Sequence, residues 1–171
     1  SHLAAVHHET TTGRLNDVAR LALLCEAHGV ELLLDAVSSF GAEALPFDSP
    51  ALSACAVTAN KCLHGIPGLC FVVARRSALQ HGAQPPRSLY LHLPLWLEQQ
   101  DQASTPFTPP VNGLLAFALL LETPSCPNLR RTRLHTITSS IRASTSAGSC
   151  QTGVRTMQRL LNRLGILPLF M

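Results

Sequence analysis

The sequence predicts an α/β fold with a mostly parallel sheet and flanking helices. A short apolar run at Leu3–Val6 is followed by a helical pattern and then by the apolar run Glu31–Val37, which is the strand–helix–strand order of a βαβ unit. Two further apolar runs follow, at Ala51–Ala59 and Leu69–Ala74. With 171 residues, 46% of them hydrophobic and 13% charged, the chain can bury a core of ordinary size.

The first unit has recognisable boundaries. The strand Leu3–Val6 leads into polar residues and a Thr-Thr-Thr-Gly turn, as expected of a buried strand that delivers polar groups at its carboxyl end. Asn16 is the expected N-cap of the helix, because its side chain can accept a hydrogen bond from an amide of the first turn. Gly29 falls where a helix ends in the left-handed conformation. The run Glu31–Val37 is typical of a parallel strand covered on both faces.

The later elements are predicted from connection length and proline positions. Nine residues (60–68) separate the two later apolar runs, whereas a parallel crossover needs about a dozen or more. Leu69–Ala74 is therefore expected to run antiparallel to its neighbour or to join the sheet elsewhere. Prolines interrupt Arg75–Trp96, which is expected to be irregular, and Val111–Leu121 is expected to be a helix opened by proline.

Charge divides the chain near residue 122. Residues 1–122 hold 6 Lys+Arg and 10 Asp+Glu, a net charge of −4, whereas residues 123–171 hold 7 Arg and no acidic residue, a net charge of +7. We therefore predict a partial large domain at 1–122, a poorly ordered segment at 123–151 and a helical segment at 152–171. The six cysteines form no CxxC pair, and the first residues lack the pattern of a signal peptide. These features predict reduced thiols in a cytoplasmic protein, and the abrupt start predicts a fragment.

Lys61 is the most informative residue, because it is the only lysine in the chain. Its simplest interpretation is a loop lysine left by a coding bias toward arginine. A functional interpretation needs a partner, and Asp35 supplies one, since a carboxylate that ends a buried run needs a cation or a hydrogen-bond donor. Thr10, Asp35 and Lys61 all fall at expected carboxyl ends of strands, where ligands bind in open α/β sheets. A lysine amine can bond to an aldehyde cofactor, and an aspartate can keep a pyridine nitrogen protonated.

Three segments occur in the same order as in one known family. HETTTGRLNDV, ELLLDAVSSFGA and ANKCLHGIPGLCFVVARR resemble the class V aminotransferases of the fold-type I pyridoxal-phosphate family, over about residues 3–121. In that family the lysine after Asn carries the cofactor, and the aspartate 26 positions before it binds the pyridine nitrogen. Asp35 and Lys61 have the same spacing of 26. The resemblance implies part of the family's large domain, incomplete at both ends, with pyridoxal 5′-phosphate as cofactor and Lys61 as the catalytic residue.

The resemblance also implies roles for further residues. Thr10 corresponds to the hydrogen-bond partner of the cofactor's ring hydroxyl, and Asn60 corresponds to a neighbour of its phosphate. Thr108, in a Phe-Thr-Pro-Pro segment, corresponds to the residue that reaches the phosphate held by the partner subunit, which implies a homodimer. We match no counterpart of the family's phosphate loop, stacking aromatic residue or substrate-binding arginine. No such role is assigned to Arg130, Arg131 or Arg133.

The activity implied by the resemblance is transamination between a small amine and a keto acid. The Thr-Thr-Thr and Ser-Ser-Phe-Gly-Ala segments favour the members of the family that act on 2-aminoethylphosphonate and pyruvate, giving phosphonoacetaldehyde and alanine. Members that act on serine or alanine with glyoxylate are the alternative. An alternative of another class is a non-catalytic remnant or an interaction fragment.

Other chemistry has less support in the residues. His7-His8 and Cys62-x-His64 offer metal-ligand types without the paired spacing of a structural zinc site, so no metal is expected. His7 and His8 are expected instead to border the cleft. The arginine-rich tail has neither interleaved aromatic residues nor a helix-turn-helix pattern, so no nucleic-acid partner is expected. No membrane partner is expected either, because no apolar run reaches the roughly 18–20 residues of a span.

Overall fold

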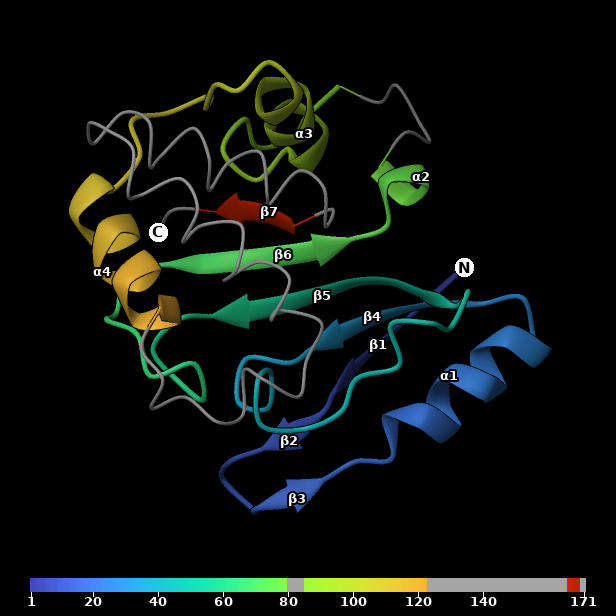
Figure 1. Ribbon diagram of the computed structural model, residues 1–171. Helices are drawn as coiled ribbons and strands as arrows, with labels where there is room; N and C mark the ends of the chain where they lie inside the picture. Colours follow the sequence, from blue (N-terminus) through green and yellow to red (C-terminus); the bar gives the residue numbers. More distant parts are fainter. Residues whose placement is uncertain (80–84, 123–165, 170–171) are drawn as a thin grey trace.

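The computed structural model describes residues 1–79, 85–122 and 166–169 (Figure 1). A five-stranded sheet in the order β1-β4-β5-β6-β7 forms its centre, and β2 and β3 form a separate two-stranded sheet. The strands are β1 (His2–Val6), β2 (His8–Glu9), β3 (Arg14–Leu15), β4 (Glu31–Asp35), β5 (Leu52–Thr58), β6 (Cys70–Ala74) and β7 (Ile166–Leu169). The helices are α1 (Val18–Ala27), α2 (Arg76–Leu79), α3 (Leu93–Asp101) and α4 (Val111–Glu122).

The topology of the central sheet confirms the predicted α/β fold. Strands β1, β4 and β5 are parallel, and α1 connects β1 to β4 as the βαβ pattern predicts. Strand β6 runs antiparallel to β5, with Thr58 opposite Cys70. The short connection explains this direction, because it allows the chain to turn back beside β5 and is too short for a parallel crossover.

Helix α1 begins one residue later than the sequence predicted. Asp17 is the N-cap, and its Oδ1 atom accepts a hydrogen bond of 3.0 Å from the backbone N–H of Arg20. The expected cap, Asn16, has a different partner, since its Nδ2 atom donates to the carbonyl oxygen of Val6 at 2.9 Å. Gly29 follows the helix with φ +61°, which confirms the predicted left-handed ending.

Helices α1 and α4 pack on one face of the sheet and share its main hydrophobic core. Leu32 and Leu34 of β4 point into this core and are 0% and 3% exposed, whereas Leu33 between them is 36% exposed. The prediction that Glu31–Val37 is covered on both faces was therefore wrong, and the strand ends at Asp35. A continuous apolar run does not distinguish a strand buried on both faces from one that is buried on a single face.

Helix α3 forms a second hydrophobic cluster. Trp96 is 2% exposed, packs with Val72 of β6, and donates from Nε1 to the carbonyl oxygen of Tyr90 at 2.7 Å. The prediction that Arg75–Trp96 is irregular was wrong in part, since it contains α2 and the start of α3. Pro94 lies in the first turn of α3, where a missing backbone N–H costs nothing.

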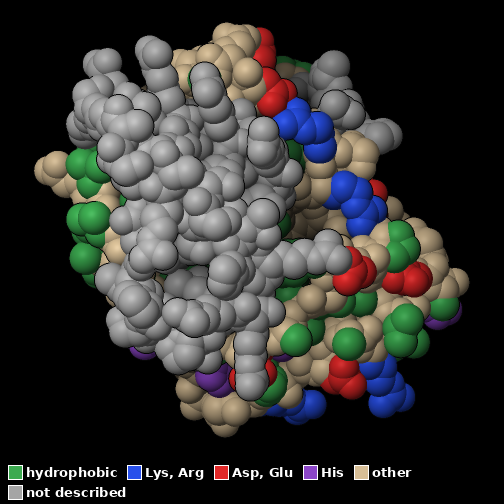
Figure 2. All heavy atoms as spheres, viewed as in Figure 1, with side chains coloured by type: hydrophobic (Ala, Val, Ile, Leu, Met, Phe, Trp, Pro, Cys, Tyr) green, Lys and Arg blue, Asp and Glu red, His purple; other side chains and the backbone are tan. Residues whose placement is uncertain are grey.

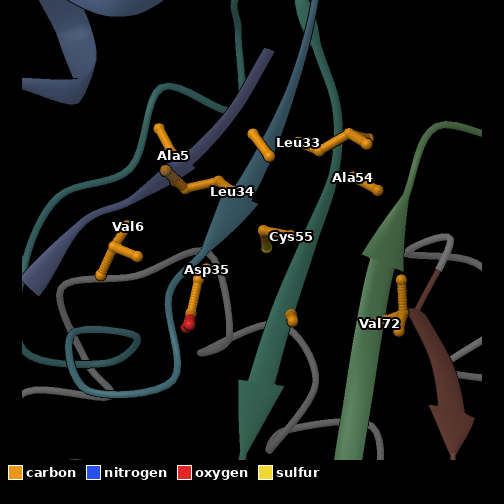
Figure 3. Close-up of a pocket in the computed structure, with 10 residues that line it drawn as sticks. Ala5, Val6, Leu33, Leu34, Asp35, Ala54, Cys55 and Val72 are labelled. Atoms are coloured by element: carbon orange, nitrogen blue, oxygen red, sulfur yellow. The ribbon is translucent and has the colours of Figure 1, made fainter. Parts of the chain in front are cut away.

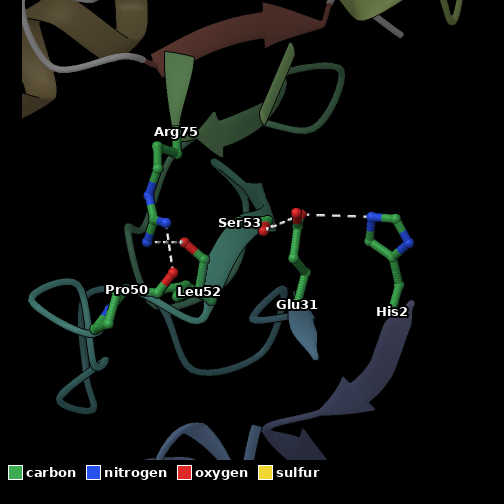
Figure 4. Close-up of polar contacts among 6 residues, drawn as sticks. All are labelled: His2, Glu31, Pro50, Leu52, Ser53 and Arg75. Carbon is green, nitrogen blue, oxygen red and sulfur yellow. Dashed lines mark hydrogen bonds and ion pairs between the residues drawn. The ribbon is translucent and has the colours of Figure 1, made fainter. Parts of the chain in front are cut away.

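Polar side chains join the strands near their amino ends (Figure 4). Glu31 accepts a hydrogen bond of 2.5 Å from the hydroxyl of Ser53, and its carboxylate lies 3.4 Å from Nε2 of His2. The hydrogen bond from Ser53 is the main reason why the pKa of Glu31 lies below its ordinary value. Arg75 donates to the backbone carbonyl oxygens of Ser49 at 2.9 Å, of Leu52 at 3.1 Å, and of Pro50. This end of the sheet is thus held by charged groups with specific partners.

The last part of the chain is described only at 166–169. The poorly ordered segment predicted at 123–151 and most of the helical segment predicted at 152–171 lie outside the described residues. Ile166–Leu169 form β7, which pairs antiparallel with β6, where the sequence predicted the end of a helical segment. Among the described residues no helix has the length and apolar character needed to cross a membrane. On the coloured part of the face that Figure 2 shows, acidic and basic side chains lie interspersed.

Candidate active site

The parallel strands bring three polar segments to one edge of the sheet. In register, Val6 lies opposite Asp35, and Asp35 lies opposite Ala56. Backbone hydrogen bonds continue the ladder past the strand ends, from His7 N to Asp35 O at 2.9 Å and from Ala36 N to Ala56 O at 3.0 Å. The segments that follow β1, β4 and β5 therefore leave the sheet side by side (Figure 1).

Asp35 is the last residue of β4 and is exposed. Its Oδ1 atom accepts a hydrogen bond of 2.9 Å from the backbone N–H of Val37, two residues along the chain. Figure 3 shows the carboxylate of Asp35 beyond the apolar side chains that line a depression on the sheet. The depression has a volume of about 400 Å³, and Asp35 is the only charged residue among the described residues that line it. A negative charge therefore stands where the apolar face meets the carboxyl end of the sheet.

Lys61 lies in a tight turn between β5 and β6 and is exposed. The turn is closed by hydrogen bonds from His64 N to Lys61 O at 2.8 Å and from Gly65 N to Ala59 O at 2.7 Å. His64 adopts φ +57°, a conformation that non-glycine residues rarely take. Asn60, also exposed, accepts a hydrogen bond of 2.6 Å at Oδ1 from the hydroxyl of Thr58. The lysine is thus presented on a turn with defined backbone geometry.

Thr10 is exposed in the turn between β2 and β3. This turn is ordered by Glu9, whose Oε1 atom accepts hydrogen bonds from the hydroxyl of Thr11 at 2.6 Å and from its backbone N–H at 3.0 Å. The hydroxyl of Thr11 is the main reason why the pKa of Glu9 is lowered. The small sheet is attached to the end of β1 through the backbone, by a hydrogen bond of 2.8 Å from Asn16 N to His7 O.

The two neighbouring histidines differ. His7 is 3% exposed, and within the described part of the chain its Nδ1 atom has no hydrogen-bond partner. Burial is the main reason why the pKa of His7 is lowered, so the ring is neutral at neutral pH. His8 is half-buried, and its Nδ1 atom lies 3.2 Å from the carbonyl oxygen of Ser38. Of the two histidines, His8 is the one whose ring nitrogen lies within hydrogen-bond distance of the segment that follows β4.

Sequence reasoning missed two residues of this edge, Ser38 and Cys62. The thiol of Cys62 donates to the carbonyl oxygen of Ser38 at 3.4 Å, which joins the segment after β5 to the segment after β4. The only local signal was that Cys62 directly follows Lys61. The acceptor is a backbone carbonyl oxygen, which every residue has, so the pattern of side chains in the sequence does not reveal this contact.

Thr108 lies on a different connecting segment from the other predicted residues. It is exposed on the segment between α3 and α4, three residues before α4 begins. Asp35 ends β4, and Thr10, Asn60 and Lys61 lie on the segments that follow β1 and β5. The predicted role of Thr108 toward a partner subunit stays a prediction.

The chemistry available at this edge is that of an amine and a carboxylate. Lys61 can act as a nucleophile toward a carbonyl carbon, and Asp35 can accept a hydrogen bond from a protonated ring nitrogen. Among the described residues, no group of three or more His, Cys, Asp or Glu side chains is arranged to hold a metal ion. The described cysteines, Cys25, Cys55, Cys62 and Cys70, are free thiols.

Comparison with known proteins identifies relatives for the same part of the chain. The family described as aminotransferase class-V matches residues 1–122. A 2-aminoethylphosphonate–pyruvate transaminase of Aeromonas hydrophila is 42% identical over 123 residues, which are 71% of this chain and 32% of that protein. The enzyme of the same name from Vibrio cholerae is 39% identical over 119 residues, 68% of this chain and 32% of that protein. The chain thus spans about a third of the length of these relatives.

Solved structures with a similar fold are also aminotransferases. An aspartate aminotransferase of Thermus thermophilus matches with a TM-score of 0.61 and 28% identity, over 85% of this chain and 40% of that chain. A pyridoxamine–pyruvate aminotransferase of Mesorhizobium loti matches with the same TM-score and identity, over 86% of this chain and 37% of that chain. Both matches agree with an α/β unit that corresponds to part of a larger fold.

Proposed function

Because the chain belongs to the class-V aminotransferase family, we propose that it forms the lysine-bearing part of a pyridoxal-phosphate-dependent transaminase. The proposed reaction transfers the amino group of 2-aminoethylphosphonate to pyruvate and gives phosphonoacetaldehyde and alanine. These substrates are proposed because two relatives named 2-aminoethylphosphonate–pyruvate transaminase are 42% and 39% identical to the chain.

One observation supports the proposal most strongly. The segments that contain Thr10, Asp35 and Lys61 follow three adjacent parallel strands and leave the same edge of the sheet. In an open α/β sheet this edge is where ligands bind. The spacing of 26 residues between Asp35 and Lys61 is also the one found in the family.

The groups at this edge fit the chemistry of pyridoxal 5′-phosphate. The carboxylate of Asp35 is exposed, and its one hydrogen bond within the described residues is a local one to Val37 N, so it can still accept a ring N–H. Lys61 supplies the chain's only side-chain amine. When bound, the cofactor provides an electron sink for the substrate carbon. Lys61 Nζ would hold the cofactor's aldehyde carbon and, once the substrate amine has replaced it there, would carry the proton from the substrate carbon to that cofactor carbon.

Three further assignments belong to the same proposal. The hydroxyl of Thr10 would bind the cofactor's ring hydroxyl, and Asn60 would lie beside its phosphate. Thr108 would reach the phosphate held by a partner subunit, so we propose a homodimer for the complete enzyme. The cytoplasmic location stays a prediction from the sequence.

Reductive labelling tests the cofactor assignment directly. The full chain is incubated with pyridoxal phosphate and reduced with borohydride, and the modified residue is located by peptide mass mapping. We expect one side-chain label, on Lys61, and a Lys61→Arg variant, which keeps the charge, should carry none. Equal labelling of the two proteins, with the label on the terminal amine alone, would contradict the proposal.

A substrate comparison tests the proposed reaction. The loaded chain is given 2-aminoethylphosphonate with pyruvate, and formation of alanine is measured by chromatography. Faster turnover of serine or alanine with glyoxylate would favour the alternative substrates. Labelling of Lys61 without turnover of either pair would identify a cofactor-binding remnant instead of an active enzyme.

A further inference from the structure

The carbonyl oxygen of Ser38 joins the three segments at the carboxyl edge of the sheet. It accepts a hydrogen bond from Nδ1 of His8 at 3.2 Å and another from the thiol of Cys62 at 3.4 Å. A backbone carbonyl has two lone pairs and can accept both bonds at once, provided that His8 carries its proton on Nδ1. His8 follows β1, Ser38 follows β4 and Cys62 follows β5.

A second contact, between Leu63 and Gly41, packs the segment after β5 against the segment after β4. Leu63 is 2% exposed and belongs to the main core, and it lies against Gly41 in the segment after β4. A Cβ atom on Gly41 would stand 2.8 Å from Cδ2 of Leu63, closer than side chains pack. Gly41 also adopts φ +93°, which other residues rarely take. Cys62 and Leu63, the two residues after Lys61, are thus both held by the segment that begins at Asp35.

We propose that Cys62 is a positioning residue for Lys61. Its hydrogen bond to Ser38 would hold the turn that carries Lys61 at a set distance from the turn that carries Asp35, with His8 holding the same carbonyl from the other side. This inference rests on the proposed function, in which Asp35 and Lys61 bind one rigid ring.

The physical reason is the rigidity of that ring. A planar aromatic ligand cannot adjust its length, so its two protein partners must be held at the right separation before it binds. A displacement of about 1 Å between reacting groups can cost about 100-fold in rate. Lys61 has a flexible side chain, so its backbone is the part that the fold can fix, and Cys62 is the next residue.

Amide hydrogen exchange tests the contact without any cofactor. In the full chain, Cys62→Ala should speed exchange of the His64 and Gly65 amides, which close the turn, by about 3- to 10-fold. Cys62→Ser should restore most of the protection, because a hydroxyl can donate to the same carbonyl. The matched control is Cys70→Ala, which removes another half-buried thiol and should leave these two amides unchanged.

Labelling of Lys61 tests the consequence for the cofactor. We expect Cys62→Ala to need a several-fold higher pyridoxal phosphate concentration for half-maximal labelling, with Cys62→Ser in between and Cys70→Ala like the unmodified chain. Unchanged exchange in Cys62→Ala, or unchanged labelling where the parent chain is labelled, would overturn the positioning role and leave the proposed function intact. Faster exchange in a chain that never takes the label would uphold the contact as structural, refute the positioning of Lys61 for a cofactor, and count against the proposed function.

Discussion

The two ends of β4 each carry a carboxylate, and the two are used differently. Glu31 and Asp35 lie four residues apart on the same face of the strand. At the amino end Glu31 is bound by Ser53 of the neighbouring strand and lies beside His2 of the other neighbour. At the carboxyl end Asp35 accepts a hydrogen bond from its own segment, at Val37. One end therefore uses its charge to join strands, whereas the other leaves its charge exposed at the carboxyl edge of the sheet.

The positive charges near the two ends show the same contrast. Arg75 donates to three backbone carbonyl groups that belong to the segment entering β5 and to the start of that strand. Lys61 is exposed, and the described hydrogen bond of this residue is made by its backbone oxygen. The amino end therefore uses its charged side chains to hold the sheet together, whereas the carboxyl end leaves its charged side chains exposed, as the proposed function requires. Substitutions at the two ends should therefore change different measured quantities.

The largest expected effect is on cofactor binding by Asp35→Asn. The amide is isosteric and can still accept from Val37, but it carries no negative charge to keep the ring nitrogen protonated. We expect the pyridoxal phosphate concentration for half-maximal labelling of Lys61 to rise about 30-fold or more. The free energy of unfolding, measured by urea denaturation, should change by less than about 0.5 kcal/mol.

Glu31→Gln is the matched control for that substitution. It removes the same charge from the same face of the same strand, at the other end. Labelling of Lys61 should be unchanged in this variant. A similar loss of labelling in both variants would show that the two carboxylates are not functionally distinct.

The next effect in size concerns stability at the amino end. Arg75→Ala leaves three carbonyl groups without their charged donor, and we expect the free energy of unfolding to fall by about 1–2 kcal/mol. Arg76→Ala is the control, because its side chain pairs with Asp101 and both side chains are more than 40% exposed. Such exposed pairs contribute about 0–1 kcal/mol. A loss as large in Arg76→Ala as in Arg75→Ala would remove the distinction between the two arginines.

The smallest effect is the pH dependence that comes from Glu31. Because its pKa in the folded chain is lowered from 4.5, chiefly by the hydroxyl of Ser53, the ionised group stabilises the fold above that value. This contribution is lost as pH falls from 4.5 through the lower folded pKa. We therefore expect the stability difference between the parent chain and Ser53→Ala to shrink on acidification, as measured by denaturation at several pH values. A difference that is constant down to strongly acidic pH would refute this.

The prediction of the fold succeeded where the length of a connection limits how the two strands that it joins can pair. The nine-residue connection excluded a parallel crossover and left two possibilities for β6, of which the structure shows the antiparallel pairing with β5. The βαβ pattern led correctly to parallel β1 and β4. Predictions failed where two neighbouring residues compete for one role, as Asn16 and Asp17 do for the N-cap. They also failed for Arg75–Trp96, where Pro94 opens a helix instead of breaking one.

The candidate site was predictable only in part. Thr10, Asp35 and Lys61 were expected at strand ends, and the segments that carry them do leave one edge of the sheet. Ser38 and Cys62 were not expected, because their contact joins a backbone oxygen to a thiol 24 residues away along the chain. Such a contact depends on how two turns pack against each other, and the periodicity of apolar residues in the sequence does not predict it.

The sequence by itself determined that β1, β4, β5 and β6 are strands, that β1 and β4 are parallel, and that Asp35 and Lys61 are 26 residues apart, because connection length and apolar periodicity act over short stretches of chain. Only the tertiary structure decided which face of β4 is buried, which cap begins α1, and that Ile166 pairs with Val73. The physical reason is that burial and strand pairing depend on what lies opposite in space. Residues far apart along the chain supply those neighbours, and a local pattern does not identify them.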